Sequence, residues 1–213
     1  SAEQLYQQAV QADPNLQSAW RNLGALLRQK GKTLEARHCT EQALKLDSSD
    51  GSLWGMGKNQ HGQLGDGTRV SSLDPQKATM PLGRNAMEIS SGSHHTCTLL
   101  DDGSIRCWGS NSFGQLGDGT TIERTTPITV DLGSGVSAIG VSSGESHTCA
   151  VLTDNRVKCW GMNTNGQIGD GTTTDRHIPA YASMGGMGAL KVSAGSYHTC
   201  AITIQRDVMC WGE

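Results

Sequence analysis

Six of the seven cysteines fall into three pairs with one spacing, and this is the most specific chemical pattern in the chain. The two cysteines of each pair are ten positions apart and flank a short polar turn: Cys97 and Cys107, Cys149 and Cys159, Cys200 and Cys210. If each turn is a three-residue hairpin loop, its two cysteines lie opposite each other with Cα atoms about 4.5–5.5 Å apart, which a disulfide can bridge. The spacing predicts three disulfides and an oxidising compartment, extracellular, at the cell surface or periplasmic.

Two other interpretations of these cysteines remain open at this point. A structural zinc site prefers cysteines two to four positions apart and four converging ligands, which this spacing does not supply. The six thiols could also stay reduced inside a core. Cys39 is left over, either as a spare thiol or as a cysteine that pairs between chains.

Histidines and aspartates recur with the cysteines. His95, His147 and His198 stand two positions before the first cysteine of each pair. Three histidines could suggest a metal site, but a residue repeated in every unit more often holds the backbone of its own unit, and we expect that structural role. The aspartate of each Gly-Asp-Gly-Thr segment supplies too few oxygens for calcium and is expected to stabilise a turn. The sequence predicts no metal, no cofactor and no catalytic residue.

The elements that position these residues repeat along the chain. Trp54, Trp108, Trp160 and Trp211 are separated by 54, 52 and 51 residues and are expected to anchor the packing of the repeats. Runs of alternating residue types stand on both sides of short polar turns and predict β-hairpins. The last residue of each turn is expected to adopt the left-handed backbone conformation. Further outer strands are expected near 78–82, 127–130 and 178–182, and inner strands near 87–90, 138–142 and 190–193. Repeats of about 50 residues with four strand signals are typical of propeller blades.

The repeats resemble those of the regulator of chromosome condensation family. The matching motifs are Trp-Gly-x-Asn followed by Gly-Gln-Leu-Gly or Gly-Gln-Ile-Gly, at residues 108–117 and 160–169, within a region from about 51 to 213. The resemblance implies a β-propeller that serves mostly as a protein-binding scaffold. Ultraviolet-sensing plant members carry extra tryptophans just before the histidine, and this chain has Ser93-His94, Glu145-Ser146 and Ser196-Tyr197 there, which argues against photoreception.

Residues 1–48 have a different composition, rich in helix formers. Small and apolar residues stand at the spacing of a tetratricopeptide repeat, and about one and a half repeats are expected, with helices near 3–12, 17–30 and 33–46. Trp20, Leu23, Leu27 and Ala36 are expected to be buried between these helices. The predicted organisation is a tetratricopeptide-like segment over 1–48 and propeller repeats over 49–213.

The fold class expected from these elements is mainly β: an incomplete propeller of about three blades behind a short helical segment. Counting strand signals from Leu53 gives two strands, two whole blades and three more strands. The absent starting methionine and the partial helical repeat suggest a piece of a longer protein. The ends of the incomplete propeller, or Cys39, could then support self-association.

Composition and charge argue against some classes of function. A net charge of −3 and a pI near 6.1, without a lysine or arginine cluster, argue against nucleic-acid binding. No apolar run approaches the roughly 18 residues of a membrane span. The leading expectation is a non-enzymatic scaffold, secreted or surface-exposed, that binds other proteins. The alternatives are a structural subunit of an extracellular assembly and an exchange factor for a small GTPase.

Overall fold

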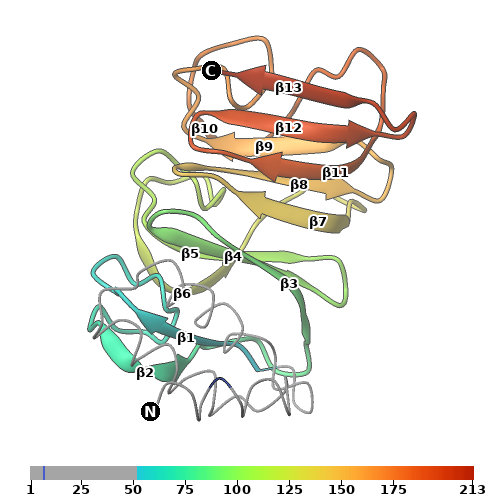
Figure 1. Ribbon diagram of the computed structural model, residues 1–213. Coiled ribbons are helices and arrows are strands. Elements are labelled where there is room, and N and C mark those ends of the chain that lie inside the picture. Colours follow the sequence, from blue (N-terminus) through green and yellow to red (C-terminus); the bar gives the residue numbers. More distant parts are fainter. Residues whose placement is uncertain (1–6, 8–51) are drawn as a thin grey trace.

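The computed structural model describes residue 7 and residues 52–213, and the described part is built from β-strands (Figure 1). The strands are β1 (Trp54–Gly57), β2 (Ser72–Lys77), β3 (Ala86–Ser91), β4 (His95–Leu100), β5 (Ile105–Gly109), β6 (Arg124–Thr129), β7 (Ala138–Ser143), β8 (His147–Leu152), β9 (Val157–Gly161), β10 (Arg176–Tyr181), β11 (Ala189–Ala194), β12 (His198–Thr203) and β13 (Val208–Gly212). The helices predicted within residues 1–48, with Trp20 and Cys39, lie outside the described residues.

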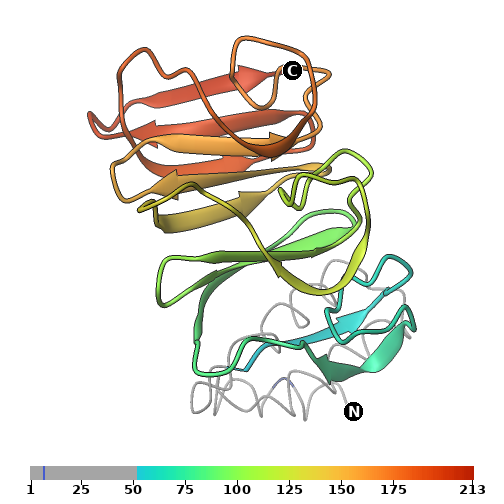
Figure 2. The ribbon, with the colours of Figure 1, turned by 180° about the vertical axis from the view of Figure 1, so that it is seen from behind.

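The strands form four antiparallel sheets, each with its strands in chain order. Two strands form the first sheet (β1–β2), four the second (β3–β6), four the third (β7–β10) and three the fourth (β11–β13). Figures 1 and 2 show the sheets following one another from β1–β2 at one end to β11–β13 at the other. The prediction of a mainly β fold with incomplete outer blades is therefore confirmed, and each sheet is called a blade below.

The central hairpins of the second, third and fourth blades turn as their sequences predict. Gly103 and Asn155 adopt positive φ angles of 77° and 63° in the last place of the turn. Arg206 does so too, at 73°, although its side chain disfavours this conformation. Two hydrogen bonds hold it there, from the backbone nitrogen of Arg206 to the oxygen of Thr203 (2.9 Å) and from the nitrogen of Thr203 to the oxygen of Asp207 (2.8 Å).

The outer strand of the first blade lies earlier than expected. It is β2, which ends at Lys77, so the prediction of a strand near 78–82 is wrong. The outer strands β2, β6 and β10 each carry a proline at their fourth position, Pro75, Pro127 and Pro179. Proline lacks a backbone N–H and fits an edge strand, so the proline marks the outer strand more reliably than the apolar residues that follow it.

Consecutive blades pack face against face. Cys97, Leu99 and Ile105 of the second blade form one buried cluster with Val141, Leu152 and Trp160 of the third. The corresponding residues of the third blade pack in the same way on the fourth. First strands of neighbouring blades are also bonded directly, as where the backbone nitrogen of Ser143 donates to the hydroxyl of Ser90 at 2.8 Å. Each blade is thus a separate sheet, and the apolar core lies between sheets.

Candidate functional site

The three predicted cysteine pairs are joined as disulfides in the structure. In each pair the cysteines are directly opposed on the two hairpin strands, with Cα atoms 4.0–4.1 Å apart. The bonds in the second and third blades are fully buried. The bond in the fourth blade is not, because Cys200 is half-buried and Cys210 is exposed. One geometry therefore occurs in two very different environments.

Two of the three repeated histidines, His95 and His147, connect neighbouring blades and also lie against glycines of their own units, Gly92 and Gly144. The Nε2 atom of His95 lies 2.9 Å from the hydroxyl oxygen of Thr148 in the next blade. That hydroxyl donates its only proton to the backbone oxygen of Gln115, 3.0 Å away. The imidazole must therefore be the donor at Nε2, which assigns the neutral Nε2–H tautomer. His147, Thr199 and Gln167 repeat the arrangement one blade later, with distances of 2.9 and 2.8 Å.

Burial keeps both histidines neutral. It lowers the pKa of His95 to about 3, and the nearby His147 and His94 add to the effect. Burial, followed by the influence of His198, lowers the pKa of His147 to about 4. The Nδ1 atoms of both rings have no hydrogen-bond partner among the described residues. These histidines act as neutral connectors, and no metal-binding group of three or more His, Cys, Asp or Glu side chains occurs in the described part of the chain.

Three of the four predicted tryptophan anchors occupy one position, and Trp54 does not. Strand β1 pairs with the outer strand β2 in the way that β5 pairs with β6, and Gly57 takes the place of Gly109. Met56 is therefore at the position of Trp108, and Trp54 is at that of Arg106. The aligned positions are 56, 108, 160 and 211, with separations of 52, 52 and 51. Trp54 is half-buried and donates to the hydroxyl of Ser52. The Trp54-Gly55 step resembles the repeat motif in sequence but lies two residues out of register.

The Gly-Gln-Leu-Gly or Gly-Gln-Ile-Gly loops of the first three blades contact the next blade. The backbone oxygen of Gln63 accepts hydrogen bonds from Trp108 Nε1 (2.8 Å) and from the hydroxyl of Thr96 (3.0 Å). Gly117 lies against Trp160 so closely that a Cβ atom there would be 2.8 Å from the indole nitrogen. These contacts agree with the close backbone approach that the glycine-rich sequence predicts.

A buried asparagine organises each connecting loop. Asn111 is fully buried, accepts the backbone N–H of Leu116 at 2.9 Å and donates to the backbone oxygens of Thr120 and Ile122. Asp118 accepts from the backbone and hydroxyl of Thr120 and from Arg124. Burial alone would raise the pKa of Asp118, but the hydrogen bonds from Thr120 and Arg124 hold it below its ordinary value. This aspartate stabilises a turn, as its sequence context predicts.

The structure also shows a surface feature that the sequence did not indicate. Each inner strand contains a β-bulge, where the pairing register shifts between Ala86 and Glu88, Ala138 and Gly140, and Ala189 and Lys191. The skipped residue is apolar and exposed in all three strands: Met87 by 63%, Ile139 by 50% and Leu190 by 42%. We call these three residues the inner-strand row. A bulge is a property of backbone pairing, so the alternation of residue types could not reveal it.

The inner-strand row lies on three strands that are neighbours in space. The Glu88 carboxylate accepts the backbone N–H of Val141 at 3.1 Å, which links β3 to β7. The backbone nitrogen of Ala194 donates to the hydroxyl of Ser142 at 2.9 Å, which links β7 to β11. Figure 1 shows these three strands one above another. An exposed apolar row on a rigid frame is suited to contact with another molecule.

Comparison with known proteins agrees with this architecture. Residues 50–99, 102–151 and 154–202 match the regulator of chromosome condensation (RCC1) repeat. Residues 17–50 match a tetratricopeptide repeat, and the count of one and a half such repeats stays a prediction. The described residues include no helix with the length and apolar character to cross a membrane.

Among related sequences, the ultraviolet-B receptor UVR8 of Arabidopsis thaliana is 38% identical over 132 residues, 62% of this chain and 30% of the receptor. The probable E3 ubiquitin-protein ligase HERC6 of Homo sapiens is 31% identical over 158 residues, 72% of this chain and 16% of the ligase. The chain therefore spans less than a third of either relative.

Solved structures show the same fold. A chain in the crystal structure of Kap60 bound to yeast RCC1 (Prp20) superposes with a TM-score of 0.66 at 23% identity, over 76% of this chain and 39% of that one. Human WBSCR16 gives 0.64 at 21% identity, over 73% and 41%. With three consecutive repeats matched over most of its length and the blade architecture that they specify, the chain belongs to the RCC1 repeat family.

Proposed function

We propose that this chain is a non-enzymatic scaffold that binds other proteins through the inner-strand row. The observation that carries the proposal is the exposure of Met87, Ile139 and Leu190 at one position of three adjacent strands. Exposed apolar side chains gathered on one surface are typical of protein interfaces, while isolated ones need no explanation. Here the same bulge exposes the same kind of side chain three times.

The surroundings of the row suit a protein partner better than a small molecule. The row follows the surface of three strands, and charged neighbours such as Glu88 and Lys191 are exposed beside it. An apolar centre with a polar rim is the usual composition of a protein interface. The buried histidines and the loop aspartates are engaged in structural hydrogen bonds, which supports a scaffold over an enzyme.

Three disulfides support the proposal that the scaffold works in an oxidising environment, secreted or at the cell surface. We propose further that residues 49–213 supply the propeller surface and that residues 1–48 form a separate tetratricopeptide-like segment. The relatives are named as a light receptor and as a probable ubiquitin ligase, and those activities are properties of proteins of which this chain spans only a part.

The test replaces the row without disturbing the fold. A triple variant, Met87→Gln, Ile139→Gln and Leu190→Gln, is compared with a control triple variant, Leu73→Gln, Ile122→Gln and Ile178→Gln, whose residues are 76%, 60% and 62% exposed elsewhere. Partners are captured on the wild-type chain from extracellular or surface extracts and then purified. Because a few central side chains carry most interface energy, we expect the row variant to bind its partner at least about 10-fold more weakly.

The control variant should bind like the wild-type chain. Equal affinity of all three proteins would refute the row as the binding surface, and equal loss in both variants would show a general effect of removing apolar side chains. The two alternatives, an assembly subunit and an exchange factor for a small GTPase, stay predictions, because no contact among the described residues favours them. Unchanged nucleotide release from a panel of small GTPases would exclude the second.

A further inference from the structure

Two histidines outside the repeated series lie together where the first blade meets the second. His61 is in the connecting loop of the first blade, and His94 directly precedes β4 of the second. Their ring centroids are 4.9 Å apart, with the ring planes inclined by 45°. Among the three interfaces of the described blades, this one alone has imidazoles at both positions. The corresponding pairs at the next two interfaces are Phe113 with Ser146 and Asn165 with Tyr197.

A carboxylate of the second blade holds the ring of His61. The Oε1 atom of Glu123 lies 2.6 Å from His61 Nδ1, and its Oε2 atom accepts a hydrogen bond from Arg69. Burial alone would raise the pKa of Glu123, but the hydrogen bonds from Arg69 and His61 hold it below its ordinary value. An ionised carboxylate can only accept a hydrogen bond, so Nδ1 of His61 is the donor.

The outward nitrogens of both rings are free to bind a ligand. A neutral imidazole with its proton on Nδ1 carries a lone pair on Nε2. No hydrogen bond to Nε2 of His61, or to either ring nitrogen of His94, is formed within the described part of the chain. A histidine that donates one N–H to a carboxylate and keeps its other nitrogen free has the usual orientation of a metal ligand.

The distance between the rings also suits a shared metal ion. With metal–nitrogen bonds of about 2.0–2.1 Å and a tetrahedral angle, two imidazoles on one ion have centroids about 5 Å apart. The two rings are 4.9 Å apart. Since His94 is exposed and its side chain forms no hydrogen bond to the described residues, its ring can turn either nitrogen toward the ion.

We propose that His61 and His94 bind a divalent transition-metal ion, Zn²⁺ or Cu²⁺, and that Glu123 orients His61 for this role. Imidazole nitrogen is a preferred ligand of both ions. The described part of the chain has no group of three or more metal-binding side chains, so water completes the coordination. Because the two ligands come from different blades, the ion joins the first blade to the second. The site lies beyond the opposite end of β3 from Met87, so it is distinct from the inner-strand row and goes beyond the proposed scaffold function.

The charges around the pair permit a cation. Arg69 carries the nearby positive charge, and it is neutralised by Glu123, to which its guanidinium is bonded. The same guanidinium donates to the backbone oxygen of Gln60 at 3.2 Å, which holds it in place. The ion therefore meets two neutral imidazoles beside a compensated ion pair.

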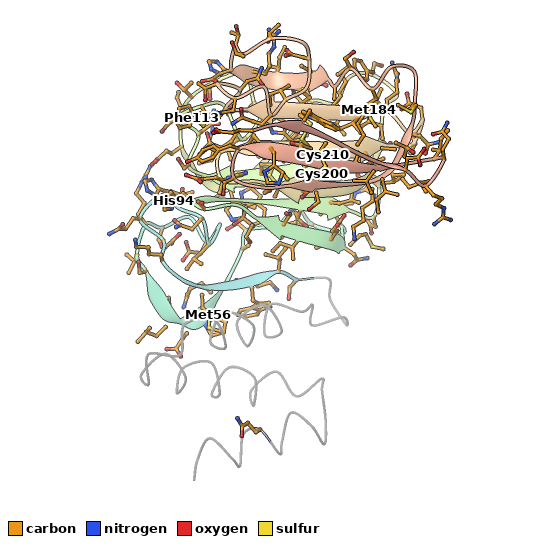
Figure 3. All side chains as sticks on the ribbon, turned by 45° about the horizontal axis from the view of Figure 1, so that its top comes forward. Met56, His94, Phe113, Met184, Cys200 and Cys210 are labelled. Carbon is orange, nitrogen blue, oxygen red and sulfur yellow. A yellow bond between two sulfur atoms is a disulfide. The ribbon has the colours of Figure 1, made fainter. Side chains whose placement is uncertain are left out.

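Access to this position is a property of the repeat. The side chain of His61 is 36% exposed. Phe113 and Ser146, the corresponding pair one interface later, are also half-buried, and they lie between two four-stranded blades. Figure 3 shows His94 and Phe113 on the same side of the blades, with Met184 on the opposite side.

The test titrates Zn²⁺ into the 213-residue chain by calorimetry. The parent protein carries Cys39→Ser, so that no free thiol competes for the ion. It is compared with the same protein carrying His94→Gln, and with a control carrying His177→Gln, which removes another exposed histidine. Loss of even an orienting group weakens metal binding about 10- to 100-fold, so we expect His94→Gln to weaken it at least about 10-fold. The control should bind Zn²⁺ like the parent.

Two further measurements identify the ligands. Electron paramagnetic resonance with Cu²⁺ should show two coupled imidazole nitrogens in the parent and one in His94→Gln. Glu123→Gln keeps an acceptor for His61 and removes the charge, so it should weaken Zn²⁺ binding about 10-fold. Equal Zn²⁺ affinity of the parent and His94→Gln would overturn the proposal, as would a parent protein that binds no Zn²⁺ at millimolar concentration.

Discussion

The hydroxyl of Thr148 holds two blades together because it accepts from His95 of one blade and donates to Gln115 of the same blade's loop. Replacing it with valine keeps the shape and removes both hydrogen bonds. A buried imidazole N–H would then have no acceptor, so we expect Thr148→Val to lower the free energy of unfolding by about 1–3 kcal/mol. Chemical denaturation measures this loss. The exposed Thr121→Val serves as the control, and a Thr148→Val chain as stable as that control would contradict the role of this hydroxyl.

The buried histidines predict how stability depends on pH. Their pKa values are lowered in the fold, so between pH 6.5 and about 4 the unfolded chain binds protons that the folded chain does not. The stabilisation that the neutral histidines contribute is therefore fully present above pH 6.5 and is lost as the pH falls. Down to pH 5 each histidine accounts for at most about 2 kcal/mol.

Denaturant unfolding at pH 7 and pH 5 tests this dependence. A double variant, His95→Gln and His147→Gln, keeps a donor at each site and removes the titration. Its stability should change less between the two pH values than that of the wild-type chain. The same change in both proteins would contradict the assignment of neutral histidines.

At the residue scale the sequence indicated which residues matter but not always what they contact. The cysteine pairing could be predicted because both partners belong to one hairpin, where spacing determines register. The partner of His95 is Thr148, more than fifty residues away, and only the packing of blades brings the two together. Trp54 was misassigned because two adjacent residue types imitate the repeat motif two positions out of register.

The connecting loops are the elements that lock each blade to the next, and their glycines can be tested in pairs. Gly117 and Gly119 have similar φ angles, 71° and 78°, in the same loop. A Cβ atom at Gly117 would be 2.8 Å from Trp160, but one at Gly119 would make an ordinary contact of 3.6 Å with Ile178. Both alanine variants strain the backbone, and only Gly117→Ala should also displace the tryptophan.

We therefore expect Gly119→Ala to lower the free energy of unfolding by about 1–2 kcal/mol and Gly117→Ala by about 1–3 kcal/mol more. Thermal and chemical unfolding of the two variants gives the difference. Equal losses would mean that backbone strain alone explains the glycine at 117. The tryptophan contact would then have no part in joining the blades.

The bulges of β3, β7 and β11 are the elements that sequence patterns could not reveal. A strand with alternating residue types buries every second side chain, so Met87 was expected to be an ordinary strand residue. The bulge adds one residue to the pairing and turns that side chain outward. The outer strands were harder to locate than the hairpins. A proline interrupts the pairing of each outer strand, and no simple alternation of apolar and polar residues marks where the strand begins and ends.

Across the whole molecule, the number and order of strands could be predicted from repetition, since each repeat confirms the interpretation of the others. The sheets of two, four, four and three strands follow the count made from the sequence. Which surfaces remain open could not be predicted, because exposure depends on how the blades stack. The inner-strand row is a consequence of that stacking.

The central claim is that the inner-strand row contacts a partner protein, and site-specific photocrosslinking tests it most directly. A photoreactive phenylalanine analogue is placed at Ile139, which is 50% exposed, in one protein and at Ile178, which is 62% exposed, in another. Irradiation with surface or extracellular extracts is followed by mass spectrometry of the crosslinked products. The scaffold account predicts one recurring partner crosslinked at Ile139 and absent at Ile178. Crosslinks of equal yield at both positions, or a partner attached only at Ile178, would contradict it.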